Sequence, residues 1–487
     1  MKKKSTLKAP TIKPIRTGKN KKPSVNYSNE TDILASFEIK NTNLTPSEAA
    51  RMLSNAANGT WTEHSHNTLV SPETPRVRPI LFTETGTKKI TVDLAFPHTY
   101  VESGSIPSLI SVIGAAMVGT GAKLIDIRIP TVLVRTFQTP SAGIDLIREG
   151  STIHGRPLLS ATMRPMTGLT PKQYAATVYD MLANGIDITC DPTMMHSLPE
   201  HAWRERTILC SRAVQEASEE SGNFCTHMVN VSANTAEEML KRAQFSIDND
   251  LNYLLVDSAS VGFSALQSLT IFARENGAVV AAMGARSMQT LAMSEQVLAK
   301  ILRFIGCDII SIPSPINDTK LTSRREVKGV ITALTKQDIP AEEATGLSFD
   351  QPTCSMKATM PACGGGHNPW HFPRLIDATG ADCIIQCGAN VMAHPDGVCA
   401  GAIANRIAVE ALVKAKDKGV NLAVDGKKVL TNTAKDCSAL KVALKHWKEG
   451  AFLFGVINGS YLNEEHPNEN HLKNTSKNIQ GTVHESS

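Results

Sequence analysis

The feature of this sequence that most constrains its fold is an alternation of short β-type runs with amphipathic helical stretches between about Ser160 and Gly419. The strand candidates, in order, are RPLLSAT, IDITC, THMVNV, YLLVDS, AVVAAM, DIISIP, ATMPACGG and DCIIQCG. Eight such runs, each followed by a helix signal, are typical of a (β/α)8 TIM barrel, a fold of the α/β class. We therefore expect the chemistry of this chain at the carboxyl ends of these strands.

Helix boundaries in this region are well marked. Three N-cap patterns predict helix starts: Thr170-Pro171 followed by Gln173, Thr235 followed by Glu238, and Ser294 followed by Val297. Asn184-Gly185 predicts the end of the first barrel helix, because glycine tolerates the left-handed conformation that such a terminus uses.

The region before the barrel has a different pattern. DILASFEIK, RVRPILFTE and KKITVDLAFP are strand-like, whereas TPSEAARMLSNAAN and IPSLISVIGAAMVG are helix-like, and this mixture predicts a smaller α+β domain. The predicted organisation is a basic disordered tail at 1–26, an N-terminal α+β domain at 27–138, the barrel at 139–455 and a polar C-terminal tail at 456–487.

Composition excludes several classes of protein. The 487-residue chain has 41% hydrophobic and 20% charged residues and no apolar run of the roughly 18 residues that a membrane span requires. Ten cysteines without a CxxC pair or a secretory signal predict reduced thiols and a cytoplasmic location. The net charge is +4, and the basic opening at 1–22 favours a solvated tail, leaves organellar targeting open and makes nucleic-acid binding an unfavoured alternative.

Several residue types at the predicted strand ends bear on chemistry. Asp191 and Asp257 are the carboxylates expected in the barrel mouth, and beside Arg164 they could form a general-base arrangement or an internal salt-bridge network, the second being favoured. Cys190 and Cys363 are both expected to face the mouth, where a packed thiol is favoured over a reactive one. A group of methionines is expected to give the mouth an apolar character: Met163, Met166, Met194, Met195 and Met283.

The same loops carry a family resemblance. The segments GTWTE, DIRIPTVLVRTFQTPSAGI, HGRPLLSATMRPMTGLT, WRERT, CGGGHNPWHFPRL and CGANVMAHPDGVCAGAIANRIAVEALVKA occur in the order found in the RuBisCO large subunit and the RuBisCO-like proteins. The chain resembles that superfamily from Asn29 to Gly455. The resemblance implies a TIM barrel behind a smaller N-terminal domain, and a homodimer or dimer-based oligomer in which each N-terminal domain reaches the partner's barrel.

The resemblance also indicates that the metal site of the family is lost. RuBisCO binds Mg²⁺ through a carbamylated lysine, an aspartate and a glutamate, and these positions fall on Cys190, Pro192 and Thr193. Cysteine forms no such carbamate and proline has no side-chain oxygen, so the hard cation would lack the oxygen ligands that it prefers. The chain therefore resembles a divergent RuBisCO-like protein of form IV type, for which no cofactor and no metal are expected.

Other reacting groups of the family are replaced as well. By the same alignment, two lysines fall on Arg164 and Met166, and a histidine, an arginine and a second histidine fall on Met283, Gly284 and Ser287. The remaining replaced positions are Asn55, Ala115, Ser311, Asp318 and Cys363. Arg286 could restore the lost charge of the arginine. Arginine stays protonated and cannot act as a base, so Arg164 keeps a charge but moves no proton.

At one phosphate site of the family, this sequence keeps the residue types that the family has. Thr60 and Trp61 match one side of it, and Gly364, Gly365 and Gly388 match glycines whose backbone amides approach the phosphate. The glycine run could equally be a turn retained for folding.

Two functions follow as hypotheses. The first is a metal-independent isomerase or enolase-type enzyme on a small, singly phosphorylated carbonyl compound, with Arg164 for anion contact, Asp191 or Asp257 as base, and Thr60, Trp61, Arg286 and the glycines for phosphate. The alternative is a catalytically silent homologue with a structural or regulatory role. Carboxylation of ribulose bisphosphate is a third, least favoured function, because fold does not settle activity.

Overall fold

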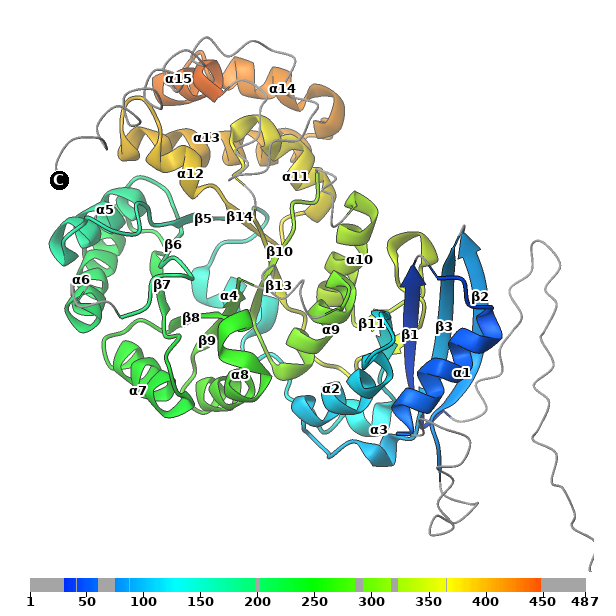
Figure 1. Cartoon of the computed structure of the whole chain (residues 1–487). Coiled ribbons are helices and arrows are strands. Elements are labelled where there is room, and N and C mark those ends of the chain that lie inside the picture. Colours follow the sequence, from blue (N-terminus) through cyan, green and yellow to red (C-terminus); the bar gives the residue numbers. More distant parts are fainter. Residues whose placement is uncertain are drawn as a thin grey trace, which may run out of the picture.

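The computed structural model describes residues 30–40, 42–59, 75–86, 88–197, 202–284, 292–316, 323–364 and 366–447. These residues form an antiparallel sheet with helices, followed by a closed barrel surrounded by helices (Figure 1). The predicted fold class is confirmed. Both predicted tails, 1–26 and 456–487, lie outside the described residues.

The N-terminal sheet has the strand order β2-β3-β1-β4, and its neighbouring strands are antiparallel. Its elements are β1 (Ile33–Lys40), α1 (Pro46–Ala57), β2 (Arg78–Gly86), β3 (Lys89–Phe96), α2 (Ile106–Gly114), β4 (Lys123–Arg128) and α3 (Thr131–Val134). The sequence patterns predicted β1, β2, β3, α1 and α2. They missed β4, whose KLIDIR is short and overlaps the start of a family motif.

The barrel closes in the order β10-β13-β14-β5-β6-β7-β8-β9. Its strands are β5 (Leu158–Thr162), β6 (Ile188–Cys190), β7 (Thr226–Asn230), β8 (Tyr253–Asp257), β9 (Val279–Met283), β10 (Ile309–Ile312), β13 (Met360–Cys363) and β14 (Ile384–Gln386). Each of the eight predicted runs contains one of these strands, so the strand predictions are confirmed. A two-stranded pair, β11 (Asp338–Ile339) and β12 (Gln351–Pro352), interrupts the connection between β10 and β13.

Helices surround the barrel (Figure 1). They are α4 (Gly143–Ser151), α5 (Pro171–Ala183), α6 (Trp203–Ser221), α7 (Ala236–Ile247), α8 (Ser258–Glu275), α9 (Glu295–Ile305), α10 (Arg324–Thr335), α11 (Phe372–Thr379), α12 (Gly388–Met392), α13 (Val398–Asp417), α14 (Leu422–Thr433) and α15 (Ser438–Trp447). The predicted N-caps are confirmed: the hydroxyls of Thr170, Thr235 and Ser294 accept hydrogen bonds from the backbone three residues on.

Side chains of the barrel strands alternate between two hydrophobic cores. One core fills the barrel and includes Leu158, Ile188, Leu255 and Ile384. The other lies between the barrel and its helices and continues into the N-terminal domain. Because the side-chain period of a strand is two, the position of a residue along its strand decides which core it enters.

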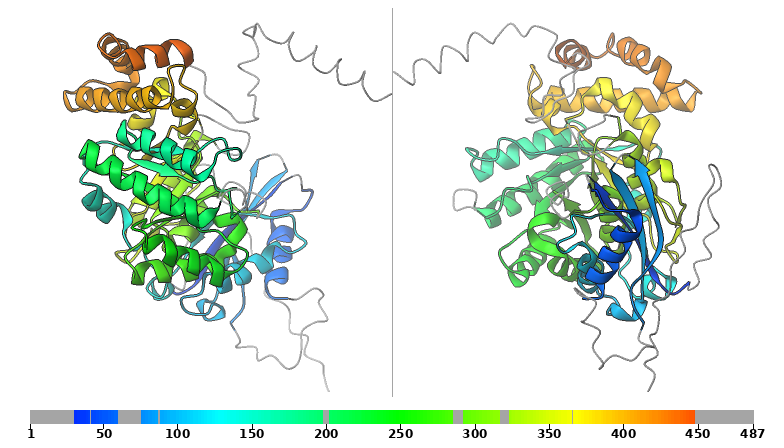
Figure 2. Two further views of the ribbon diagram at one scale, coloured as in Figure 1. Left: turned by 90° about the vertical axis from the view of Figure 1, so that its left-hand side faces the viewer. Right: turned by 45° about the vertical axis from the view of Figure 1, so that its right-hand side comes forward.

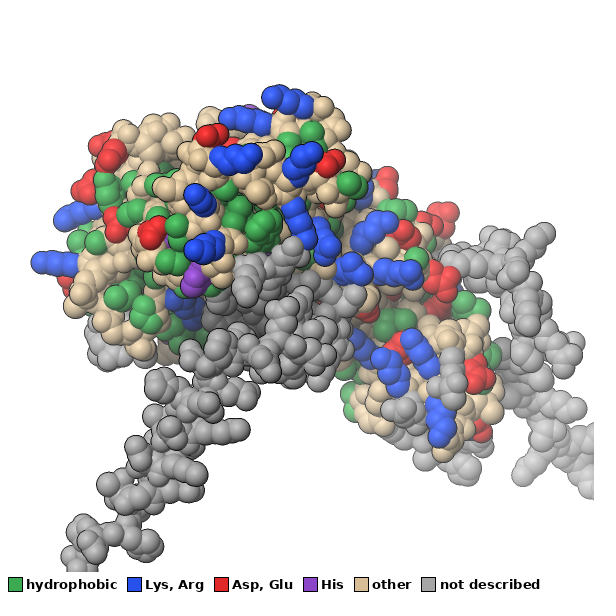
Figure 3. All heavy atoms as spheres, turned by 90° about the horizontal axis from the view of Figure 1, so that it is seen from above, with side chains coloured by type: hydrophobic (Ala, Val, Ile, Leu, Met, Phe, Trp, Pro, Cys, Tyr) green, Lys and Arg blue, Asp and Glu red, His purple; other side chains and the backbone are tan. Residues whose placement is uncertain are grey.

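The outermost helices, α13 to α15, present lysines to solvent, as the view from above shows (Figure 3). Lys414, Lys418, Lys428, Lys441 and Lys445 are exposed, and none of them lines the cavity described below. In the described part of the chain, no helix is both long enough and apolar enough to traverse a bilayer.

A buried ion pair fixes the N-terminal sheet to the barrel. Lys300 on α9 donates to Asp126 Oδ1 on β4 at 2.5 Å, and both side chains are 0% exposed. The other oxygen of Asp126 accepts the backbone amides of Ser348 and Phe349. Figure 2 shows the sheet against this side of the barrel, where β4 packs on α9. Both carboxylate oxygens of Asp126 thereby accept hydrogen bonds within the protein, which is the condition for a buried charge to be tolerated.

Asp93 on β3 is buried close to this pair, with Ser36 between it and Asp126 in the strand register. Burial, and secondarily the charge of Asp126, raises the pKa of Asp93 to about 6 from an ordinary value of 3.8. Since the folded-state pKa is the higher one, this group stabilises the fold fully below pH 4, and the contribution is lost as the pH rises through 6.

We expect Asp93→Asn to be more stable than the parent chain at pH 8 by up to roughly 3 kcal/mol, because one pKa unit corresponds to about 1.4 kcal/mol. Below pH 4 the difference should be much smaller. Urea unfolding at both pH values, followed by circular dichroism, measures this. The exposed carboxylate Asp382 provides the control, Asp382→Asn. A stability difference that does not change with pH would contradict the assignment.

Candidate functional site

A cavity of about 170 Å³ opens at the carboxyl ends of the barrel strands. It is lined by Thr162, Arg164, Cys190, Asp191, Thr193, Leu255, Met283, Gly284, Ser311 and Gln386. These residues come from the ends of β5, β6, β9, β10 and β14 and from the body of β8. The predicted location of the site at the strand ends therefore coincides with a cavity, as the barrel architecture leads one to expect.

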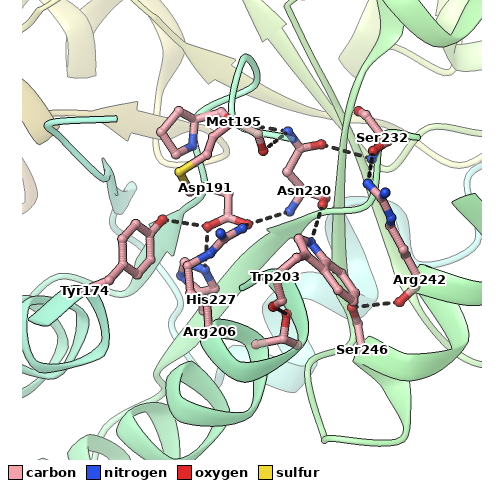
Figure 4. Close-up of polar contacts among 12 residues, drawn as sticks. Tyr174, Asp191, Met195, Trp203, Arg206, His227, Asn230, Ser232, Arg242 and Ser246 are labelled. Atoms are coloured by element: carbon pink, nitrogen blue, oxygen red, sulfur yellow. Dashed lines mark hydrogen bonds and ion pairs between the residues drawn. The ribbon is translucent and has the colours of Figure 1, made fainter. Parts of the chain in front are cut away.

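Asp191 is the most heavily hydrogen-bonded of the lining residues (Figure 4). Its Oδ1 accepts from the Tyr174 hydroxyl at 2.5 Å and lies 3.2 Å from His227 Nε2. Its Oδ2 accepts from Arg206 Nη2 at 3.2 Å and from the backbone amide of Asn230 at 3.0 Å. With 1% of its surface exposed, the carboxylate is embedded in the protein.

The network determines the charge of Asp191. Burial acts to raise its pKa, but the guanidinium of Arg206 and the hydrogen bonds from His227 and Tyr174 outweigh burial and hold the pKa well below its usual range. A carboxylate that is so stabilised in its charged form is a weak base. Asp191 thus lies in an internal ion-pair network, but its arginine is Arg206, whereas the sequence interpretation had named Arg164.

Asn230 at the end of β7 shapes the turn that follows β6. Its side-chain amide donates to the carbonyls of Pro192, Thr193 and Met195 at 3.1, 2.9 and 3.1 Å. The backbone carbonyl of Asn230 accepts a hydrogen bond from the indole N–H of Trp203 at 3.0 Å. Because Asn230 also supplies a backbone amide to Asp191, one residue holds both the carboxylate and the loop beside it (Figure 4).

Cys190 faces the interior of the barrel, as predicted. Burial, assisted by the charge of Asp191, raises the pKa of its thiol far above the ordinary value. The thiol is therefore protonated at neutral pH, and a protonated thiol is neither a nucleophile nor a good metal ligand.

The end of β6 does not offer a donor set that fits Mg²⁺. Mg²⁺ prefers six oxygen ligands in an octahedron. Cys190 offers a buried thiol and Pro192 no side-chain donor, while both oxygens of Asp191 already accept hydrogen bonds from the protein. Of these four residues, Thr193 is the one whose side-chain oxygen could still bind a cation. Across the described ranges, no group of three or more His, Cys, Asp or Glu side chains could hold a metal ion.

Two expectations about the mouth are wrong. Cys363 points into the core between barrel and helices, together with Ile312 and Ile385, because its neighbour Ala362 takes the inward position. The methionines do not gather in the mouth either. Met283 lines the cavity, whereas Met163 and Met195 belong to the outer core and Met194 is 60% exposed.

The glycines of the retained motifs serve close packing. A β carbon on Gly388 would lie 2.7 Å from the amide nitrogen of Thr162, so the approach of α12 to β5 requires glycine here. The amide of Gly364 donates to the carbonyl of Ile312 at 3.1 Å and is therefore already used. These contacts are those of a turn retained for folding, and the phosphate interpretation of Gly364 and Gly388 stays a prediction.

Asp257 borders the cavity from behind Gly284. Its Oδ1 accepts the amide of Ala259 at 3.1 Å and so caps α8, a helix that bends at Gly262. A β carbon on Gly284, whose φ is +70°, would lie 2.5 Å from the same oxygen. Glycine at this strand end thus lets the carboxylate of Asp257 approach the cavity wall.

The remaining predicted residues divide into two groups. Asn55 on α1 and Ala115, next to α2, are in the N-terminal domain, and no described residue of that domain lines the cavity. Met166 follows β5 and does not line it either. Thr60, Trp61, Arg286, Ser287, Asp318 and Gly365 lie outside the described residues.

Sequence reasoning missed the partners of Asp191. Tyr174 lies on the same helical face as Val178 and Met181, so its hydroxyl had to find a partner at the buried side of α5. That pattern was visible, but the identity of the partner was not. Arg206 and His227 come from α6 and β7, and only the closed barrel brings them to Asp191. Gln386 was also missed, although it ends a predicted strand.

The comparison with known families agrees with this architecture. A family model described as the ribulose bisphosphate carboxylase large chain, catalytic domain, matches residues 143–447. A second model, the N-terminal domain of the same large chain, matches residues 24–133. The first match alone covers more than half of the chain.

We expect Asp191→Asn to destabilise the protein by about 3–5 kcal/mol at pH 7, because it leaves the 2%-exposed guanidinium of Arg206 without its counter-charge. Since the pKa of Asp191 is depressed in the fold, the deficit should shrink as the pH falls below 4. Urea unfolding measures both effects.

The matched control is Asp382→Asn. Asp382 pairs with Arg148 at the same distance of 3.2 Å, but Asp382 is 60% exposed. Arg148 is only 7% exposed, but in this variant it still donates to the carbonyls of Ile153, Arg156 and Ala381, so the variant should lose at most about 1 kcal/mol. Equal losses in the two variants would argue against a buried, charged Asp191.

Proposed function

We propose, from the premise that the chain belongs to the ribulose bisphosphate carboxylase large-chain family, that it is a RuBisCO-like member without ribulose-bisphosphate carboxylase activity. In this proposal its barrel mouth is a metal-free site for one small anion. The observation that carries the proposal is the end of β6, where protein side chains, rather than positions open to a cation, surround the carboxylate of Asp191.

The argument against carboxylation concerns the oxygen ligands that a metal ion would need. Metal-stabilised enediolate chemistry needs a cation bound by several oxygens. To recruit Asp191, a cation would have to displace Arg206 or Tyr174 from the carboxylate and leave that buried group without its bond to Asp191. Such a loss costs several kcal/mol, which Thr193 and water would have to offset.

The argument for an anion is one of charge. Arg164 lies in the cavity wall after β5. The negative charge of Asp191 is balanced by Arg206 on the side away from the cavity, so it repels an incoming anion less than a free carboxylate would. Arginine forms paired hydrogen bonds with carboxylate and phosphate groups, and it keeps its charge at every physiological pH.

Catalysis at this site would need a base, and the geometry favours Asp257 over Asp191 for that role. Asp257 borders the cavity through Gly284, whereas both oxygens of Asp191 are occupied. A metal-independent isomerisation or enolisation of a carbonyl compound would therefore use Asp257 for the proton and Arg164 for the developing negative charge.

A second candidate is a catalytically silent homologue with a structural or regulatory role. The occupied carboxylate of Asp191 and the protonated, buried thiol of Cys190 favour it, since two polar groups of the mouth are engaged in the fold. The two candidates share the metal-free anion site and differ in whether bound ligand is converted.

We expect the purified chain to fix no labelled CO2 with ribulose bisphosphate in the presence of Mg²⁺ and bicarbonate. We also expect Mg²⁺ with bicarbonate to leave its melting temperature unchanged, because a ligand that does not bind the folded state cannot stabilise it. Calcium chloride at equal ionic strength is the control. Fixation that requires Mg²⁺ would refute the proposal.

We further propose that the chain forms a homodimer or a dimer-based oligomer. The support is that no described residue of the N-terminal domain lines the cavity, while family resemblance gives that domain a role in the partner's barrel. Static light scattering should give at least twice the mass of one chain. A stable mass of one chain at micromolar concentration would contradict the proposal.

A further inference from the structure

We infer that the mouth binds a small monocarboxylic acid carrying one further oxygen, such as a hydroxy or oxo acid of about six to eight non-hydrogen atoms. The inference rests on the proposed metal-free anion site and names its ligand class. It differs from the phosphorylated ligand that the sequence suggested.

The size of the ligand follows from the volume. The cavity measures about 170 Å³. An engineered apolar cavity of about 150 Å³ accepts benzene, and pockets for drug-sized ligands measure about 300–1,000 Å³. A four-carbon acid matches the space between the lining residues, whereas a sugar bisphosphate would extend beyond them.

The need for a second oxygen follows from hydrogen-bonding groups that the fold leaves unused. Within the described residues, the hydroxyls of Thr162, Thr193 and Ser311 form no hydrogen bond, and the Gln386 amide makes one weak contact, 3.7 Å from Nε2 to Met283 Sδ. These groups are not among the polar atoms buried away from solvent, so a polar ligand in the cavity can replace water on them.

These idle groups lie on one arc of the barrel. Ser311 comes from β10, Gln386 from β14 and Thr162 from β5, and β13, β14 and β5 follow β10 in the closed order. Arg164 follows Thr162 on the same arc. A ligand held by its charge at Arg164 would therefore have neutral donors and acceptors beside it within the same cavity.

The single charge of Arg164 and the backbone amide of Gly364 both favour a carboxylate ligand over a phosphate. Arg164 supplies one positive charge, which matches a monoanion better than the near-dianion of a phosphate ester. Phosphate sites commonly use several free backbone amides, but the amide of Gly364 is bonded to the carbonyl of Ile312. The planar fork of arginine matches a planar carboxylate without such help.

Isothermal titration calorimetry of the full chain tests the inference with 2-hydroxybutyrate and 2-oxobutyrate as probes. Butyrate lacks the further oxygen and 2-hydroxybutyramide lacks the charge, and each should bind at least about tenfold more weakly than the hydroxy acid. Inorganic phosphate and ribulose bisphosphate complete the panel and should bind more weakly still.

Variants separate the two contacts. Arg164→Met should weaken 2-hydroxybutyrate by about 10- to 100-fold, whereas Lys172→Met, which removes an exposed cation on α5, should leave it unchanged. Gln386→Met, of similar size, should weaken the hydroxy acid about 3- to 10-fold and leave butyrate unchanged. Ser311→Ala serves the same purpose if the Gln386 variant does not fold.

The outcomes distinguish the inference from the proposal beneath it. Binding of phosphate that depends on Arg164, without binding of either acid, would overturn the inference and keep the metal-free anion site. Binding of the acids that Arg164→Met leaves unchanged would also overturn it. If no probe binds, the inference and the proposed anion site fail together, whereas the assignment as a family member without carboxylase activity stands. Mg²⁺-dependent CO2 fixation would instead remove the proposed function.

Discussion

The buried charge of Asp191 is the constraint on which the rest of the site depends. A carboxylate with 1% exposure costs several kcal/mol unless its lost water contacts are replaced. Here the replacements come from α5, α6 and β7, through Tyr174, Arg206 and His227. Since each partner belongs to a strand of the barrel or to a helix that covers it, the end of β6 is part of the structural framework. The strand end that carries Asp191 thus contributes to the stability of the fold.

The polar capacity of the mouth consequently lies elsewhere. Thr162, Gln386 and Ser311 keep unused hydrogen-bonding groups, and Arg164 adds a charge, on the arc from β10 through β14 to β5. The residues available to a ligand and the residues that stabilise the fold around Asp191 therefore lie in different parts of the same barrel. This separation explains how a chain can keep the family fold while its chemistry changes, because function resides in the residues placed on a fold rather than in the fold.

Much of the fold could be predicted from the sequence, because local patterns encode it. The eight barrel strands and the caps at Thr170, Thr235 and Ser294 are confirmed. Side-chain direction was predicted less well, since one residue of register reverses it: Cys363 was assigned to the mouth, but Ala362 takes that place. The partners of Asp191 could not be found, because Arg206 and His227 meet it only after the barrel has closed.

The matching glycines illustrate why similarity to a family can outlast its chemistry. Gly388 is required because a β carbon there would lie 2.7 Å from the amide of Thr162, whatever the mouth binds. Glycine at 364 instead leaves room for the Gln386 side chain, because a β carbon there would lie 3.1 Å from Gln386 Oε1. A glycine such as Gly388 is constrained by backbone packing, so it can persist when a ligand changes. Residues whose cost of substitution depends on the ligand alone, such as Thr162, Ser311 and Gln386, carry the information about function. The identity of what this barrel binds is therefore to be sought in its unbonded polar groups and not in its retained glycine motifs.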